Sequence, residues 1–93
     1  MIGSIRHKGL RNYWTRGRTG GLNGEWIRRL RRILSALEAA ERPEQMNYPG
    51  SYFHPLKSAR AGHYAVRLTA NYRVTFGWDE DGAVDVDIED YHR

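Results

Sequence analysis

From His63 onward, polar and apolar residues alternate along the chain, and this pattern constrains the fold more than any other feature. The apolar positions are Tyr64, Val66, Leu68 and Ala70 in a first run, then Tyr72, Val74, Phe76 and Trp78 in a second. A period of two is typical of strands with one buried face. The Asp81-Gly82 pair predicts a hairpin turn into a last strand with Val84, Val86 and Ile88 on the apolar face. The sequence therefore predicts a three-stranded antiparallel meander.

Two helical patterns precede these strands. Residues 8–16 carry Leu10, Tyr13 and Trp14 at helical spacing, and four glycines between residues 17 and 24 then predict a flexible connection. A second helix follows, with Asn23 as its cap and Pro43 ending it by disfavouring helix at the preceding residue. Its apolar stripe consists of Trp26, Ile27, Leu30, Ile33, Leu34 and Leu37.

These patterns predict an α+β fold in one domain over residues 1–93. A chain of this length has one modest core, which two N-terminal helices packed on one face of a small antiparallel sheet would supply. Residues 1–6 are a candidate first strand, which gives the order β-α-α-β-β-β. With no cysteine and no apolar stretch long enough for a signal peptide or membrane span, we expect a soluble cytoplasmic protein.

Charge is unevenly distributed along the chain. Residues 1–42 carry a net +7 and residues 43–93 a net −3, which together give the overall +4. A basic surface of this kind attracts polyanions such as nucleic acid, although a solvated helix face has the same composition. The helix residues concerned are Arg28, Arg29, Arg31 and Arg32, with Arg16 and Arg18 nearby in the chain.

The face of the sheet away from the helices is expected to be open and charged. The alternation places Arg67, Arg73, Thr75, Asp85, Asp87, Glu89 and Tyr91 there. For Arg67 we expect an ordinary cross-strand ion pair. The alternation does not place Asp90 or His92, because pleating is unreliable beyond the last paired residue.

Several residue types present suit the cleavage of RNA. Attack of a 2′-hydroxyl on the neighbouring phosphodiester needs a base, an acid and cations on the phosphate, and it needs no metal. Histidine is able to carry either proton near neutral pH, arginine and lysine bind phosphate, and tyrosine stacks on bases. The candidates are His54, Lys57, Arg73, Tyr91 and His92. Taken singly, each is more often an ordinary surface residue, and composition alone does not bring them together.

Three motifs in order resemble a known family. They are H-P-L-K at residues 54–57, G-H-Y-A-V-R-L-T-A-N-Y-R-V-T-F at residues 62–76, and E-D-Y-H at residues 89–92. This combination resembles the HigB, or plasmid maintenance system killer, branch of the RelE/ParE toxin superfamily. The opening I-R-H-K-G-L and the helix R-L-R-R-I-L-S-A-L-E-A-A are similar to the same family, so the resemblance covers nearly the whole chain.

The resemblance implies a type II toxin that cleaves messenger RNA in the ribosomal A site, without cofactor or metal. It also implies a HigA-type helix-turn-helix antitoxin, with operator DNA bound only through the toxin–antitoxin complex. The matching functional positions are His54, Lys57, Arg73, Asp90, Tyr91 and His92. In this interpretation the two histidines transfer protons, Arg73 and Lys57 bind phosphate, Tyr91 stacks on the displaced nucleotide and Asp90 orients a histidine.

The chain departs from the family pattern in the loop after His54. The family usually has Lys-Gly-Asp-Arg where this sequence has Lys57-Ser58-Ala59-Arg60. Two alternatives also stay open. Some members of the superfamily poison DNA gyrase and cut no RNA, and a degenerate toxin would act only as a protein-binding module. If the enzyme works on the ribosome, the six arginines of residues 16–32 are candidates for binding ribosomal RNA.

Overall fold

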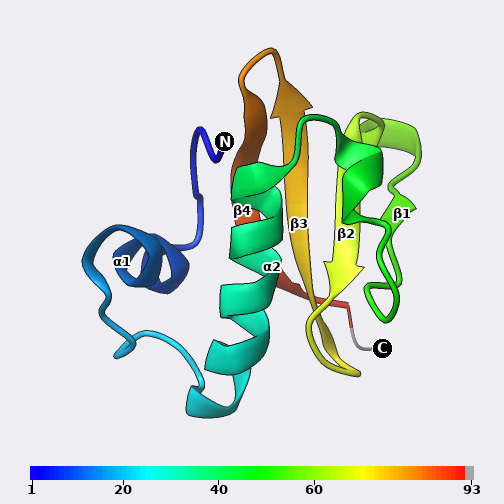
Figure 1. The fold of residues 1–93 in the computed structure, drawn as a ribbon. Helices are drawn as coiled ribbons and strands as arrows, with labels where there is room; N and C mark the ends of the chain where they lie inside the picture. Colours follow the sequence, from blue (N-terminus) through cyan, green and yellow to red (C-terminus); the bar gives the residue numbers. More distant parts are fainter. Residues whose placement is uncertain (92–93) are drawn as a thin grey trace.

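A computed structural model of the protein describes residues 1–91, and Figure 1 shows their arrangement. Two α-helices come first in the chain, followed by four strands in one antiparallel sheet of order β1-β2-β3-β4. The helices are α1 (Lys8–Arg16) and α2 (Ile27–Ala39), with short 3-10 turns η1 (Gly24–Trp26), η2 (Pro43–Met46) and η3 (Ser58–Arg60). The strands are β1 (His54–Pro55), β2 (His63–Arg67), β3 (Tyr72–Asp79) and β4 (Gly82–Asp90). The predicted α+β class is confirmed.

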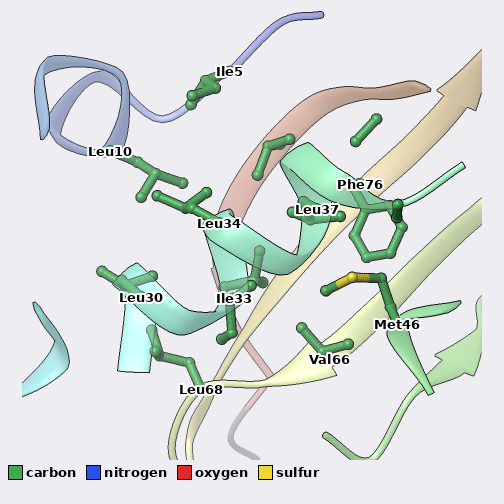
Figure 2. Close-up of a cluster of buried hydrophobic side chains, with 14 residues drawn as sticks. Ile5, Leu10, Leu30, Ile33, Leu34, Leu37, Met46, Val66, Leu68 and Phe76 are labelled. Atoms are coloured by element: carbon green, nitrogen blue, oxygen red, sulfur yellow. The ribbon is translucent and has the colours of Figure 1, made fainter. Parts of the chain in front are cut away.

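The core lies between α2 and one face of the sheet. Helix α2 crosses this face, whereas α1 lies beyond the β4 side of the sheet (Figure 1). Figure 2 shows Leu30, Ile33, Leu34 and Leu37 of α2 beside Val66 and Phe76 of the strands, with Leu10 reaching in from α1. All of these side chains are buried. The apolar stripe predicted from the sequence is therefore the surface that α2 buries, and this burial is the main source of stability.

The helix boundaries follow local capping signals. The Nδ1 atom of His7 accepts the backbone N–H of Leu10 at the start of α1, and Gly17 ends this helix in the left-handed region at φ 71°. The Asn23 side chain accepts the backbone N–H of Glu25 and so caps η1, which leads into α2. Helix α2 ends at Ala39, three residues before Arg42. The helix therefore ends earlier than the position at which Pro43 would disfavour it.

The N-terminal segment is less regular than the predicted first strand. Ile2 and Ile5 form isolated parallel bridges with Ala83 and Val86 of β4, rather than a strand of their own. A two-residue strand, β1, is added instead at the opposite edge, where His54 pairs with Ala65 of β2. The order of elements therefore differs in detail from the prediction. The bridges nevertheless occupy part of the free edge of β4, which would otherwise expose unpaired backbone groups.

A β-bulge in β4 corrects one predicted face. Thr75 pairs with Asp87 and Gly77 pairs with Val84, so β4 has one more residue than β3 between these two pairs. Asp85 is the extra residue. Its φ of 53° lies in the left-handed region, which Asp tolerates better than most residues. Beyond the bulge the alternation is shifted by one. Ala83 therefore joins the buried core in the place predicted for Val84.

The open face, which is the side of the sheet opposite α2, carries the charged and polar residues of the strands. The register aligns Arg67 with Arg73 and Arg73 with Glu89 across β2, β3 and β4. The next set across the sheet is His54, Ala65, Thr75 and Asp87. Since directly paired residues share a face, both sets lie on the open face. Within residues 1–91, no helix is long and apolar enough to cross a membrane.

Candidate functional site

A hollow of about 370 Å³ lies on the open face. It is lined by Tyr52, Phe53, His54, Arg67, Arg73 and Tyr91. These residues come from the segment around β1, from β2 and β3, and from the residue that follows β4. The turn between β2 and β3 and the C-terminal end of β4 lie at the same end of the molecule (Figure 1). Antiparallel pairing therefore brings together residues that are up to 39 positions apart in sequence, from Tyr52 to Tyr91.

Two arginines stand side by side in this hollow. Arg67 and Arg73 are direct cross-strand partners, and like charges in that arrangement destabilise a sheet. Each guanidinium lies over a tyrosine ring instead of a carboxylate. The Cζ atom of Arg67 is 5.0 Å from the ring centroid of Tyr52, and that of Arg73 is 4.9 Å from that of Tyr91. An aromatic face attracts a cation without neutralising it, so both charges remain available to an anion.

The predicted ion pair of Arg67 is therefore wrong, because the residue across from Arg67 is another arginine. Among the atoms of residues 1–91, the buried Nε of Arg73 also has no hydrogen-bond acceptor. A buried guanidinium N–H without an acceptor is costly. The hollow thus contains two adjacent cations that form no ion pair within residues 1–91.

Glu89 is the carboxylate nearest in register to Arg73, but Arg60 holds it. Both terminal nitrogens of Arg60 donate to the two carboxylate oxygens of Glu89, at 2.6 Å each, and this is the ion pair found within residues 1–91. The hydroxyl of buried Thr75 donates to the same carboxylate. The hydrogen bond from Arg60 is the largest cause that lowers the pKa of Glu89 from 4.5 to about 2, and the Thr75 hydrogen bond and the charges of Arg60 and Arg73 act in the same direction. Arg60 thereby fixes the loop after β1 to β4.

His54 is exposed at the edge of the hollow and has a defined orientation. Its Nδ1 lies 3.0 Å from the backbone oxygen of Tyr52. Since a carbonyl oxygen only accepts, Nδ1 must carry the proton in this contact. In the neutral ring, Nε2 is then the free acceptor. This arrangement suits a general base, because the hydrogen bond from Nδ1 to the Tyr52 oxygen keeps the proton on Nδ1 and leaves Nε2 able to accept one.

The other predicted site residues lie outside the hollow or outside the described residues. Lys57 is exposed at the start of η3 and does not line the hollow. Asp90 pairs with Tyr72 at the end of β4, so the register places it on the face that Tyr72 occupies. His92 lies outside the residues that the structure describes. Ser58, where the family usually has glycine, adopts φ 58°, a conformation that glycine accepts without strain.

A second basic surface lies on the helix side of the molecule. A hollow of about 430 Å³ is lined by Glu25, Trp26, Arg28, Arg29, Arg32, Leu68 and Thr69. Arg29 donates to the backbone oxygen of Leu68, and the Arg32 guanidinium lies over the ring of Tyr48. Arg31 instead donates to the hydroxyl of Tyr13, while Arg16 and Arg18 are exposed at and after the end of α1. The structure therefore brings together three of the six arginines proposed to bind RNA.

Sequence reasoning missed Tyr52 and assigned Arg67 no functional role. Tyr52 lies in an irregular segment, where no periodic signal predicts the direction of a side chain. Arg67 was placed on the correct face, but the sequence does not specify register, and register makes its neighbour an arginine. Arg60 was noted only as part of a motif, and its partner Glu89 is 29 residues away.

The fold belongs to the RelE-like class. The structure of YafQ from E. coli strain BL21(DE3) is similar, with a TM-score of 0.58 at 13% identity over 98% of this chain and 92% of that one, which supports the fold alone. The model of the family "HigB-like_toxin: RelE-like toxin of type II toxin-antitoxin system HigB" matches residues 3–92.

The chain belongs to this HigB-like toxin family, and membership implies an antitoxin partner. A curated relative, "Endoribonuclease HigB" of Proteus vulgaris, is 34% identical over 92 residues, covering 99% of this chain and 100% of the relative.

The depressed pKa of Glu89 predicts a specific dependence of stability on pH. The folded-state pKa lies below the unfolded value, so the carboxylate stabilises the fold fully above about pH 4.5. This contribution is lost as the pH falls through about 2. We expect Glu89→Gln to lower the free energy of unfolding at pH 7 by roughly 1 to 2 kcal/mol, discounted for partial exposure, because Arg60 loses its partner.

Urea unfolding of both proteins between pH 7 and pH 2 measures this effect. The difference between wild type and Glu89→Gln should shrink steadily below pH 4.5. Glu80→Gln, in the exposed β3–β4 turn, is the matched control and should follow the wild type throughout. A wild-type advantage over Glu89→Gln that stays constant down to pH 2 would contradict the role assigned to the ion pair.

Proposed function

We propose that the protein is the toxin of a type II toxin–antitoxin system and an endoribonuclease that cleaves messenger RNA in the ribosomal A site. The observation that carries this proposal is the meeting of His54, Arg67, Arg73 and Tyr91 in one hollow on the open face. The hollow provides a proton acceptor and two cations, which are among the groups that cleavage of RNA requires, and two exposed aromatic rings on which bases are able to stack. The similarity to a curated endoribonuclease supports the same activity.

In this mechanism the 2′-hydroxyl of the cleaved nucleotide attacks the adjacent phosphorus. Nε2 of His54 takes the proton of this hydroxyl, since its other nitrogen is held by the Tyr52 carbonyl. Arg73 binds the non-bridging phosphate oxygens as negative charge builds on them, with Lys57 joining from the loop after β1. His92 protonates the departing 5′-oxygen, and Asp90 orients His92 rather than His54, because the register places Asp90 on the face that Tyr72 occupies. Tyr91 stacks on the displaced base.

The charge distribution of α2 supports binding to a large RNA such as the ribosome. Arginines occupy its N-terminal half and Glu38 lies near its C-terminus, the reverse of the distribution that the helix dipole favours. Such an arrangement costs a few tenths of a kcal/mol per charge, and phosphates of ribosomal RNA would compensate for it. We assign this contact to Arg16, Arg18, Arg28, Arg29, Arg31 and Arg32. The reaction then takes place in the cytoplasm, where a HigA-type antitoxin neutralises the toxin and carries the complex to operator DNA.

Primer extension on a message translated in vitro tests the nuclease directly. We expect cuts within codons that require ribosomes, because the second basic surface contributes the binding that a small hollow lacks. His54→Ala and His92→Ala should each reduce the cleavage rate by at least a hundredfold, since each removes one proton transfer. Arg42→Ala, exposed beyond the end of α2, is a suitable control and should cleave normally.

An intact message in the presence of wild-type protein would contradict the nuclease. Linearised DNA held by gyrase in the same extract would identify the protein as a gyrase poison, and neither product would indicate a protein-binding module. Cleavage at full rate by His54→Ala would retain the nuclease but remove His54 from the mechanism.

Ribosome binding should depend steeply on salt. If the six arginines contact phosphates, the logarithm of the affinity falls linearly with the logarithm of salt concentration, and reversing Arg28 and Arg32 to glutamate reduces the slope. Sedimentation of the His54→Ala protein with ribosomes between 50 and 300 mM KCl, roughly the range over which such contacts weaken, measures this effect. A flat response, or unchanged binding after the two reversals, would show that ribosome binding does not use this surface.

A further inference from the structure

The hollow contains a second unit that matches the pair formed by Arg73 and Tyr91. Arg67 and Tyr52 repeat the same arrangement on the β1 side, with a guanidinium over a tyrosine ring at 5.0 Å against 4.9 Å. The two arginines are adjacent across β2 and β3, and each is drawn toward a tyrosine on its own side of the hollow. The site is therefore approximately symmetric, with two cations at its centre and an aromatic ring at each rim.

Tyr52 is not placed there by the needs of folding. Tyr52 as a whole residue is 65% exposed, and it and Tyr91, at 38%, are the two exposed aromatic residues among residues 1–91. Its backbone lies in the left-handed region at φ 53°, where a residue with a bulky side chain is strained by about 1 kcal/mol or more. An exposed cation–π contact returns no more than about 1 kcal/mol. A strained backbone that presents an exposed ring points to a role in binding.

The position of Arg67 is also unexplained by stability. It faces another arginine across the sheet, and the nearest carboxylate in that register, Glu89, is taken by Arg60. Its backbone N–H donates to the Ser51 oxygen at 2.8 Å, which ties β2 to the segment that carries Tyr52. The Arg67 guanidinium and the Tyr52 ring are thus held together by the backbone. The N–H groups at the edge of the guanidinium remain available for a phosphate.

We propose that Tyr52 and Arg67 form a second nucleotide subsite, so that the hollow holds two consecutive nucleotides of single-stranded RNA. Arg67 binds the phosphate next to the one that is cleaved, and Tyr52 stacks on the neighbouring base. Arg73 binds the phosphate that is cleaved, and Tyr91 stacks on the base that is displaced. This inference rests on the proposed function for the identity of the ligand. It adds an aromatic and a cationic contact on the β1 side that aligns the strand before the 2′-hydroxyl attacks.

The strain at Tyr52 allows a test that separates binding from folding. Tyr52→Gly removes the ring and relieves the backbone, so the thermal midpoint should stay equal or rise while RNA binding weakens. Arg67→Gln removes the cation and also the repulsion with Arg73. For both variants we expect the KM for cleavage of a programmed ribosome to rise about tenfold or more, with a smaller change in kcat. Tyr52→Phe keeps the ring and should recover most of the lost affinity.

Two measurements together distinguish this subsite from the proposed function. The first is cleavage kinetics on ribosomes, and the second is binding of a fluorescein-labelled 2′-O-methyl RNA hexanucleotide, which cannot be cut, at low salt. Arg42→Gln removes the same charge at an exposed position beyond the end of α2. It should match the wild type in both the cleavage kinetics and the hexanucleotide binding. Weaker hexanucleotide binding by Tyr52→Gly and Arg67→Gln supports the subsite, even if wild type leaves ribosomal message intact and the proposed function fails.

Wild-type affinity and wild-type KM in both variants would overturn the subsite while leaving the nuclease in place. A loss of affinity in Tyr52→Gly that Tyr52→Phe does not recover would also contradict it, because the stacking surface would then not be the cause.

Discussion

The ion pair between Arg60 and Glu89 determines what the open face of this sheet is able to do. Glu89 is the direct cross-strand neighbour of Arg73, and without another partner it would neutralise that arginine. Arg60 reaches from the loop after β1 and engages both carboxylate oxygens, with Thr75 adding a third hydrogen bond. Arg73 therefore interacts with Glu89 through its charge but forms no ion pair with it among residues 1–91, and its guanidinium lies over the Tyr91 ring. The same contact fixes the loop that carries Lys57 relative to the strand that ends at Asp90.

Several features of the open face and of α2 reduce the stability of the fold. Arg67 and Arg73 repel each other, Tyr52 and Ser58 adopt left-handed backbone conformations, and α2 carries its arginines at the end where its dipole disfavours them. Each of these costs is small beside the burial of the α2 stripe on the sheet. A bound polyanion would reduce the repulsion between the two arginines and the unfavourable dipole interaction of α2. An ordinary core thus supports local costs on both faces of the sheet.

The sequence predicted those parts of the fold that depend on local periodicity. The boundaries of α1 and the turn before Gly82 follow from residue spacing alone, and the structure confirms them. The apolar faces of β2 and β3 are also confirmed, except that β2 ends at Arg67 and the predicted apolar position Ala70 is exposed in the turn beyond it. The bulge at Asp85 escaped prediction because a single extra residue shifts a face without changing composition. The ion pair of Arg60 and the pairing of Arg67 with Arg73 depend on register between distant segments. The alternation placed Tyr91 on the open face, but only the family resemblance gave His54, Tyr91 and the other site residues particular roles. These roles, including those of Lys57, Arg73, Asp90 and His92, stay predictions.

In the proposed mechanism, the open face cleaves RNA by directing the 2′-hydroxyl of one nucleotide onto its own 3′-phosphate. This mechanism is tested with messages that carry a single 2′-deoxynucleotide at the mapped cleavage position, presented in the A site of a programmed ribosome. The mechanism predicts that this one substitution abolishes the cut, that the all-ribose message is cut, and that its upstream fragment ends in a 2′,3′-cyclic phosphate. Cleavage of the deoxy-substituted message at an undiminished rate would contradict it, because water rather than the 2′-hydroxyl would then be the nucleophile.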